Sequence, residues 1–99
     1  MLVEWTSDTG GVTSGVNTYS TIASVPLLTT MVITANCFAN PNEEATGGGG
    51  GALDTVSASV MRLHSSFKSG TQQWQVSVEN TDPVNPHNAL AEVICVPTT

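Results

Sequence analysis

The chain has 99 residues, of which 39% are apolar and 10% are charged, and its formal net charge at pH 7 is −6. This length allows one domain with a single modest core, and the apolar fraction is too high for a disordered chain. Arg62 and Lys68 are the only basic side chains against eight carboxylates, which excludes nucleic-acid binding and electrostatic membrane binding.

The first residues carry no targeting signal. Residues 1–11 lack both a basic region and an apolar segment of the length that a secretory signal needs, and no apolar run is long enough to cross a bilayer. If Met1 is the natural start, we expect a protein that reaches an oxidising place by a route such as cell lysis. If Met1 is a cloning scar, one module cut from a secreted protein fits the sequence equally well. Either way, we expect a virion or extracellular location.

Residues 1–17 are predicted to form an N-terminal arm or edge strand, and residues 18–99 a single β-sandwich domain. Leu2, Val3 and Trp5 give the arm an apolar start, which is followed by a tract rich in Ser, Thr, Gly and Asp. Trp5 either folds back onto its own domain or anchors in a neighbour, and we expect these three residues to interact with other subunits.

Alternating residues predict the first two strands of the domain. Residues 18–25 place Tyr19, Thr21, Ala23 and Val25 on one face, and Pro26 ends this strand. Residues 31–38 place Ile33, Ala35 and Cys37 on one face, so the cysteine points inward.

The next segment combines turn residues with glycines. Residues 40–44 (AsnProAsnGluGlu) are typical of a turn. The five glycines 47–51 are either a flexible tip or a strand against which another backbone or a large aromatic ring lies flat. We favour the strand, because apolar residues resume at Ala52 and Leu53.

Three further strands are expected. Residues 56–67 change phase, which predicts a strand with a bulge near Val60 and Met61 rather than a helix. Residues 74–79 alternate most clearly, with Trp74 inward, and residues 80–88 form the following loop. Residues 89–96 close the domain. Their outer face carries apolar side chains, so either this strand is covered on both faces or its outer face meets a partner; the side chains are Leu90, Ile94 and Val96.

Short strands separated by turns, with no tandem repeat, predict an all-β fold, a small antiparallel β-sandwich of the immunoglobulin-like or jelly-roll-like type. The cysteines lack zinc spacing, so by themselves they indicate either a disulfide or buried thiols, and we favour the disulfide.

A series of short motifs lies along about two thirds of the chain, namely Cys37, Gly47-Gly48-Gly49, Ser57, Ser59, Trp74-Gln75-Val76, Asn80 and Val93-Ile94-Cys95. This series resembles a module of bacterial secreted and phage proteins with a cysteine, a triple glycine, a Gly-Trp-x-Val strand, an Asn-containing turn and an Ala-x-Cys ending. The chain departs from the module where Cys37 is not followed by Pro-Ala-Gly and where Gln73 replaces a glycine. The resemblance implies an immunoglobulin-like or related sandwich and a Cys37–Cys95 disulfide, without a shared activity.

No catalytic or metal motif is recognisable. No serine lies in Gly-x-Ser-x-Gly, and His64 and His87 have no acid at a triad spacing, so we interpret both as surface residues. Trp74 is interpreted as a core residue rather than a ligand platform. Calcium is the one ion for which hard-oxygen donors lie on predicted loops, either Asn40, Asn42, Glu43 and Glu44 or Glu79 and Asp82, but without an EF-hand register. We expect no enzyme activity, no metal and no cofactor.

The preferred hypothesis is a structural protein of a larger assembly, most specifically a bacteriophage capsid decoration or cement protein that is present as a homo-oligomer or in many symmetric copies. The alternative is a secreted β-sandwich module that recognises glycan or protein. A small hydrolase is a third and weaker hypothesis.

Overall fold

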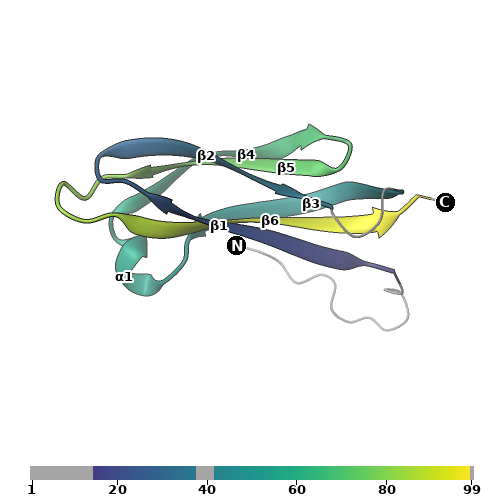
Figure 1. Cartoon of the computed structure of the whole chain (residues 1–99), viewed down its shortest axis with the longest axis horizontal. Helices are drawn as coiled ribbons and strands as arrows, with labels where there is room; N and C mark the ends of the chain where they lie inside the picture. Colours follow the sequence, from purple (N-terminus) through teal and green to yellow (C-terminus); the bar gives the residue numbers. More distant parts are fainter. Residues whose placement is uncertain (1–14, 38–41, 99) are drawn as a thin grey trace.

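A computed structural model describes residues 15–37 and 42–98, which form two antiparallel three-stranded sheets. Sheet A has the order β1-β6-β3 and sheet B the order β2-β5-β4, and the two sheets form separate layers in Figure 1. The elements are β1 (Asn17–Val25), β2 (Thr29–Asn36), β3 (Glu43–Ala52), α1 (Thr55–Ala58), β4 (Met61–Gly70), β5 (Gln73–Asn80) and β6 (His87–Pro97). The predicted all-β fold with one disulfide is confirmed, whereas its assignment to an immunoglobulin-like or jelly-roll-like type stays a prediction.

The core lies between the two sheets and is built from small side chains. Alternate residues of β1, β2, β5 and β6 point inward, as their sequence alternation predicts. Apart from Asn80, the largest fully buried side chains are valines and a cysteine. The buried apolar cluster draws on both sheets and consists of Val25, Ile33, Ala35, Cys37, Ala45, Val76, Val78, Ala89, Ala91, Val93 and Cys95.

The glycine tract is a strand, as we favoured, and it lies under an aromatic ring. A Cβ atom added to Gly48 would stand 2.5 Å from Cγ of Trp74, so the half-buried indole packs directly on the glycine backbone. A Cβ atom at Gly50 would stand 3.0 Å from a methyl group of Val76. Gly49 has no such neighbour within 4 Å, because its hydrogens point to the outer face of sheet A. Alternate glycines of β3 therefore allow the close approach of β5.

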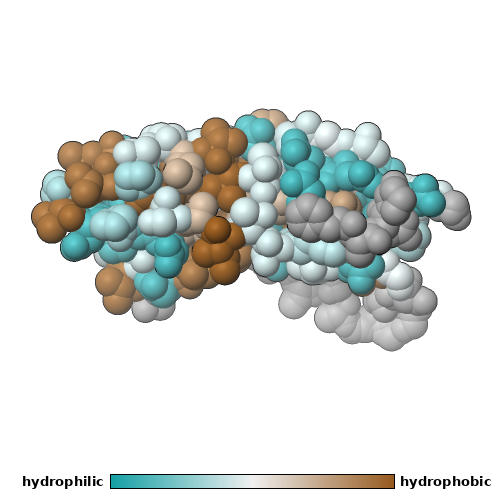
Figure 2. Space-filling model, viewed as in Figure 1, coloured by the Kyte–Doolittle hydropathy of each residue, from teal (hydrophilic) through white to brown (hydrophobic). Residues whose placement is uncertain are grey.

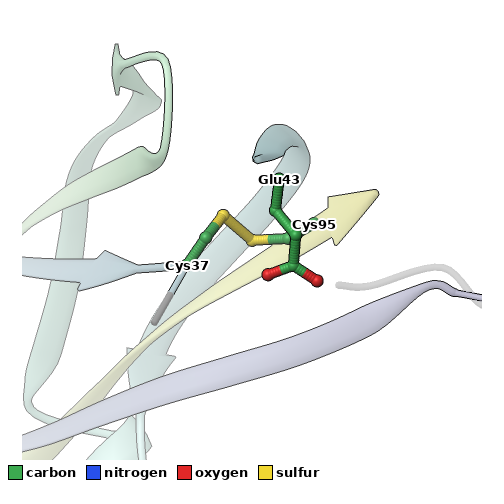
Figure 3. A group of neighbouring side chains, drawn as sticks. All are labelled: Cys37, Glu43 and Cys95. Atoms are coloured by element: carbon green, nitrogen blue, oxygen red, sulfur yellow. A yellow bond between two sulfur atoms is a disulfide. The ribbon is translucent and has the colours of Figure 1, made fainter. Parts of the chain in front are cut away.

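The predicted turn over residues 40–44 is wrong at its end. Glu43 and Glu44 belong to β3, and the Glu43 side chain is buried beside the Cys37–Cys95 disulfide (Figure 3). Its carboxylate accepts hydrogen bonds from Nδ2 of Asn17 at 2.7 Å and from the hydroxyl of Tyr19 at 2.9 Å. These bonds join the two outer strands of sheet A across β6, and they explain why a carboxylate is tolerated inside the protein.

The predicted strand over residues 56–67 is wrong in its first part. Residues Thr55–Ala58 form the short helix α1, with Asp54 as its N-cap: the carboxylate accepts from the Ser57 backbone N–H at 2.7 Å. The strand begins at Met61, and its first register shift lies between Leu63 and Ser65 rather than near Val60. No helix among the described residues has the length and apolar character to cross a membrane.

Alanine substitutions in the glycine tract should destabilise the protein on the inner face of β3 but not on its outer face. Gly48→Ala should lower the free energy of unfolding by about 1–3 kcal/mol, because the new methyl group overlaps both the carbonyl oxygen of Glu92 and the Trp74 ring. Gly49→Ala is the matched control and should change it by less than about 1 kcal/mol, since its Cβ enters open space. Urea unfolding of the two variants measures the difference, and equal effects would contradict the packing.

Removing the disulfide should destabilise the domain. The bond joins cysteines 58 residues apart in the sequence, and closing a loop of that size contributes about 4 kcal/mol in the chain-entropy model. Unfolding of the Cys37→Ala/Cys95→Ala variant measures this loss. Intact mass after alkylation under denaturing, non-reducing conditions checks the bond itself, and two alkylated thiols in freshly isolated native protein would contradict it.

Candidate functional site

Exposed apolar side chains gather at the end of the molecule that carries α1, the β1–β2 turn and the β5–β6 loop, on the left in Figure 1. Figure 2 shows this end as a largely hydrophobic surface. We call it the apolar end, and its exposed fractions run from 41% for Leu53 to 73% for Val56. It consists of Leu27 and Leu28 in the β1–β2 turn, Leu53 and Val56 around α1, and Val84 in the β5–β6 loop.

Both the backbone conformation and the solvent exposure of Leu28 are unfavourable for the stability of the isolated domain. Its φ of 50° lies in the left-handed region, which costs a side-chain-bearing residue about 1 kcal/mol or more relative to glycine. Its side chain is also 63% exposed to solvent. Asparagine or glycine would suit this turn position better on both counts. A strained and exposed leucine at a turn is the kind of feature that marks a functional surface.

The buried side chain of Asn80 holds the loops of the apolar end in place through hydrogen bonds. Its amide nitrogen donates to the carbonyl of Val25 at 3.1 Å and to the carbonyl of Asn85 at 3.0 Å. Its amide oxygen accepts from the backbone N–H of Asp82 at 2.9 Å. One side chain thereby joins the end of β1 to the β5–β6 loop. Further bonds connect the loops themselves: the backbone N–H of Leu28 donates to the carbonyl of Asp82, and that of Thr81 to the carbonyl of Val60.

A second set of bonds centres on His87, the first residue of β6. Its Nε2 atom lies 2.7 Å from Oδ2 of Asp82, and its Nδ1 atom lies 3.0 Å from the hydroxyl of Ser57 in α1. The His87 bond, followed by the bond from the Val84 backbone N–H, lowers the pKa of Asp82 below its ordinary value. The N-cap bond from Ser57 lowers the pKa of Asp54 in the same way. The helix and the loop are therefore held together through one imidazole.

The Ser57–His87–Asp82 chain differs from a hydrolytic triad in two ways. In a triad the carboxylate bonds Nδ1 and the serine bonds Nε2, whereas here the two ring nitrogens have exchanged partners. Ser57 is also only 3% exposed, so its hydroxyl does not face a substrate. The arrangement serves to position the loops. Our interpretation of His87 as a surface residue is wrong, because its side chain is 14% exposed, whereas His64 is exposed as predicted.

The predicted interaction residues fall in two regions. Leu2, Val3 and Trp5 lie outside the described residues. Leu90, Ile94 and Val96 are half-buried on β6, the central strand of sheet A, in the phase that alternates with the core residues. Beside Leu90 lies a shallow hollow of about 380 Å³. Its lining consists of Gly48, Gly49, Gly50, Gly51, Ala52, Leu63, Leu90 and Glu92.

The candidate calcium donors that the structure describes have other partners. Glu43 accepts from Asn17 and Tyr19, and Glu44 pairs with Lys68 at 2.8 Å. Glu79 bonds His64 at 2.8 Å, and Asp82 bonds His87 at 2.7 Å. Asn40 lies outside the described residues. The sulfurs of Cys37 and Cys95 lie close to the Glu43 carboxylate, but as a disulfide they are not thiolate ligands.

The apolar end was missed from the sequence, although parts of its signal were present. Leu27 and Leu28 follow Pro26 in a segment that neither predicted strand included, and Asp54 stands three residues before Ser57 in N-cap spacing. The remaining members are single apolar residues in separate loops. Only the pairing of β1 and β3 with β6 brings those loops together.

Asp82→Asn should reduce the loss of stability in acid. Because the folded-state pKa of Asp82 is lowered, its stabilising contribution is complete above the ordinary value of 3.8 and is lost as the pH falls through the lower folded-state value. Urea unfolding between pH 6 and about pH 2 should therefore show a shallower pH dependence in the variant. Asn85→Ala, in the same loop, is the control and should keep the wild-type dependence. Equal slopes for the wild type and Asp82→Asn would contradict the assignment.

Comparisons of the chain with protein-family models, with curated proteins and with solved structures gave no significant match. The resemblance to the phage and secreted β-sandwich module therefore stays a prediction. What the protein does must be inferred from the chemistry of the described surface, above all from the apolar end.

Proposed function

We propose that this protein is a non-enzymatic attachment protein that docks through its apolar end onto a protein surface of a larger assembly. The most specific form of the proposal is a capsid decoration or cement protein of a bacteriophage, carried in many copies on a symmetric particle. Docking through one end would leave the rest of the elongated domain, 47 Å in its longest extent, projecting from the surface.

The observation that carries the proposal is that exposed apolar side chains stand on loops that are already fixed. Asn80 and His87 join the end of β1, α1 and the β5–β6 loop, and the Leu28 backbone N–H joins the β1–β2 turn to the carbonyl of Asp82. Ordering a mobile loop on binding would cost about 0.5–1.5 kcal/mol for each immobilised side chain, and a preorganised surface avoids much of that cost. Rigid loops that present leucine and valine are suited to burial in a complementary protein surface.

The charge around the apolar end indicates which surface it fits. Asp54 and Asp82 lie within its loops, residues 26–28, 53–60 and 81–86, which contain no lysine or arginine; the nearest basic residue in the sequence is Arg62, the second residue of β4. Such a surface is repelled by phosphate groups, which argues against a lipid headgroup or nucleic acid as the partner. An apolar depression on a shell protein fits it better. Burying one leucine or valine fully contributes roughly 1.5–3 kcal/mol, and many copies add avidity.

The alternative, a secreted recognition module, is favoured by one observation, the hollow at the edge strand β3, which is lined by Leu90 and Glu92 of sheet A and by Leu63 of sheet B. The hollow has a floor of glycine backbone, and Glu92 offers an acceptor for a hydroxyl group or an amine. In that case the ligand would bind on the face of the sheet, and the apolar end would not be required.

The substitution Leu28→Asn tests the attachment surface. It removes an exposed apolar side chain and places a residue that tolerates left-handed backbone at φ 50°, so the melting temperature should stay equal or rise while attachment weakens by about tenfold or more. Phe67→Asn, on the outer face of sheet B, is the control and should leave attachment unchanged. Co-sedimentation of each variant with particles from the native source measures attachment.

Two results would contradict the proposal. One is recovery of the native protein free in the medium with none in the particle fraction, which would favour the recognition module. The other is unchanged attachment of Leu28→Asn combined with weaker attachment of Leu90→Asn, which would place the contact on the face of sheet A.

A further inference from the structure

Each sheet has two edge strands, and the four edges are protected very unequally. The edges are β1 and β3 in sheet A and β2 and β4 in sheet B. An exposed edge is a template for pairing with another chain, and proteins blunt their edges with bulges and charged side chains. Edge strands with bulges and charged side chains therefore resist pairing with another chain, and edge strands that lack both permit it.

The edges β3 and β4 carry both kinds of protection. The pairing of β3 shifts register between Ala45 and Gly47, and that of β4 shifts twice, between Leu63 and Ser65 and between Lys68 and Gly70. Charged or ionisable side chains also stand on both strands: Glu43 and Glu44 on β3, and Arg62, His64 and Lys68 on β4. The backbone N–H of Ala45 is further used by the carbonyl of Thr71.

Within the described residues, the edges β1 and β2 show neither a register shift nor a charged side chain. β1 pairs with β6 along all nine of its residues without a register shift, and β2 pairs with β5 along all eight. The two strands contain no Asp, Glu, Lys, Arg, His or Pro. In a chain with a net charge of −6, this uncharged side is where a second copy meets the least electrostatic repulsion.

We propose that a second copy of this chain pairs, in antiparallel fashion, with the edge of β1 that no other described strand occupies, so that the two A sheets become one six-stranded sheet. β1 is the longer of the two unprotected edges. The proposal goes beyond the proposed function, because it concerns the interface between the β1 strands of two copies, here called the seam, and not the apolar end. A twofold axis perpendicular to the sheet keeps the core face and the outer face of both copies in register.

The sequence of β1 suits pairing with itself about Thr21. Thr21 would meet Thr21 of the second copy, a favourable cross-strand pair, and on the outer face Ser20 would meet Ile22. The two Ile22 side chains would then stand diagonally across the seam, within reach of each other. Ile22 is 57% exposed in the single chain and lies beside Leu90 of β6, so the seam gives it an apolar neighbour on each side.

The test is sedimentation equilibrium of the full chain over a wide concentration range, with amide hydrogen exchange at both ends of the range. The 10.2 kDa chain should approach twice its mass as concentration rises, and the β1 amides directed to the free edge should gain protection with it. Ile22→Lys places two like charges across the seam and should weaken dimerisation by about tenfold or more. Thr46→Lys, on the bulged edge β3 of the same sheet, is the matched control and should dimerise like the wild type.

The other outcomes overturn the proposal. A chain that stays monomeric at all concentrations has no such seam, and β1 amides protected independently of concentration would mean that another part of the same chain covers the edge. A dimer that Val32→Lys weakens but Ile22→Lys does not would place the seam on β2. A dimer that only Leu28→Asn weakens would join two apolar ends, and it would overturn the seam without removing the surface on which the proposed function depends.

Discussion

The contact between the Trp74 ring and the backbone of Gly48 controls how the two sheets meet. Because Gly48 has no side chain, β3 and β5 approach closely enough for an indole to lie against a peptide backbone. A side chain at this position would either push the sheets apart or expel the tryptophan. The rest of the fully buried core consists mostly of alanines and valines, which fill a narrow space and would not fill a wider one.

A core of this kind supplies limited hydrophobic stabilisation. A disulfide and side-chain hydrogen bonds hold the strands and loops together at the two ends of the domain. At one end the disulfide lies beside the buried Glu43, which bonds the first residues of β1. At the other end Asn80 and His87 bond the loops. Both sets are polar groups with their partners satisfied, so burial does not leave them unpaired. The ends of the strands are therefore fixed by directional bonds, and the centre by packing.

The strands were predictable where one face is buried and the other wet, since alternation then specifies both the strand and its inward residues, as for Ile33, Val76 and Val93. Prediction failed where a local bond overrides alternation. Asp54 caps a short helix in a segment that alternates like a strand, and Glu43 is buried because Asn17 and Tyr19 meet it from another strand. The Asp54–Ser57 spacing is a local signal that the strand-like alternation outweighed. The partners of Glu43, in contrast, are distant in the sequence, so no local pattern reveals them. The same holds for the apolar end.

The position of β6 has a consequence for how the protein is made. β6 is the central strand of sheet A, and both β1 and β3 pair with it rather than with each other. On a ribosome, β1 and β3 therefore have no partner in their sheet until residues 87–97 have emerged. Sheet B, whose strands all precede β6, is complete earlier. Among the described strands, the uncharged strand β1 is thus synthesised first and, together with β3, paired last, so its backbone stays exposed longest in the nascent chain, where unpaired strands promote aggregation.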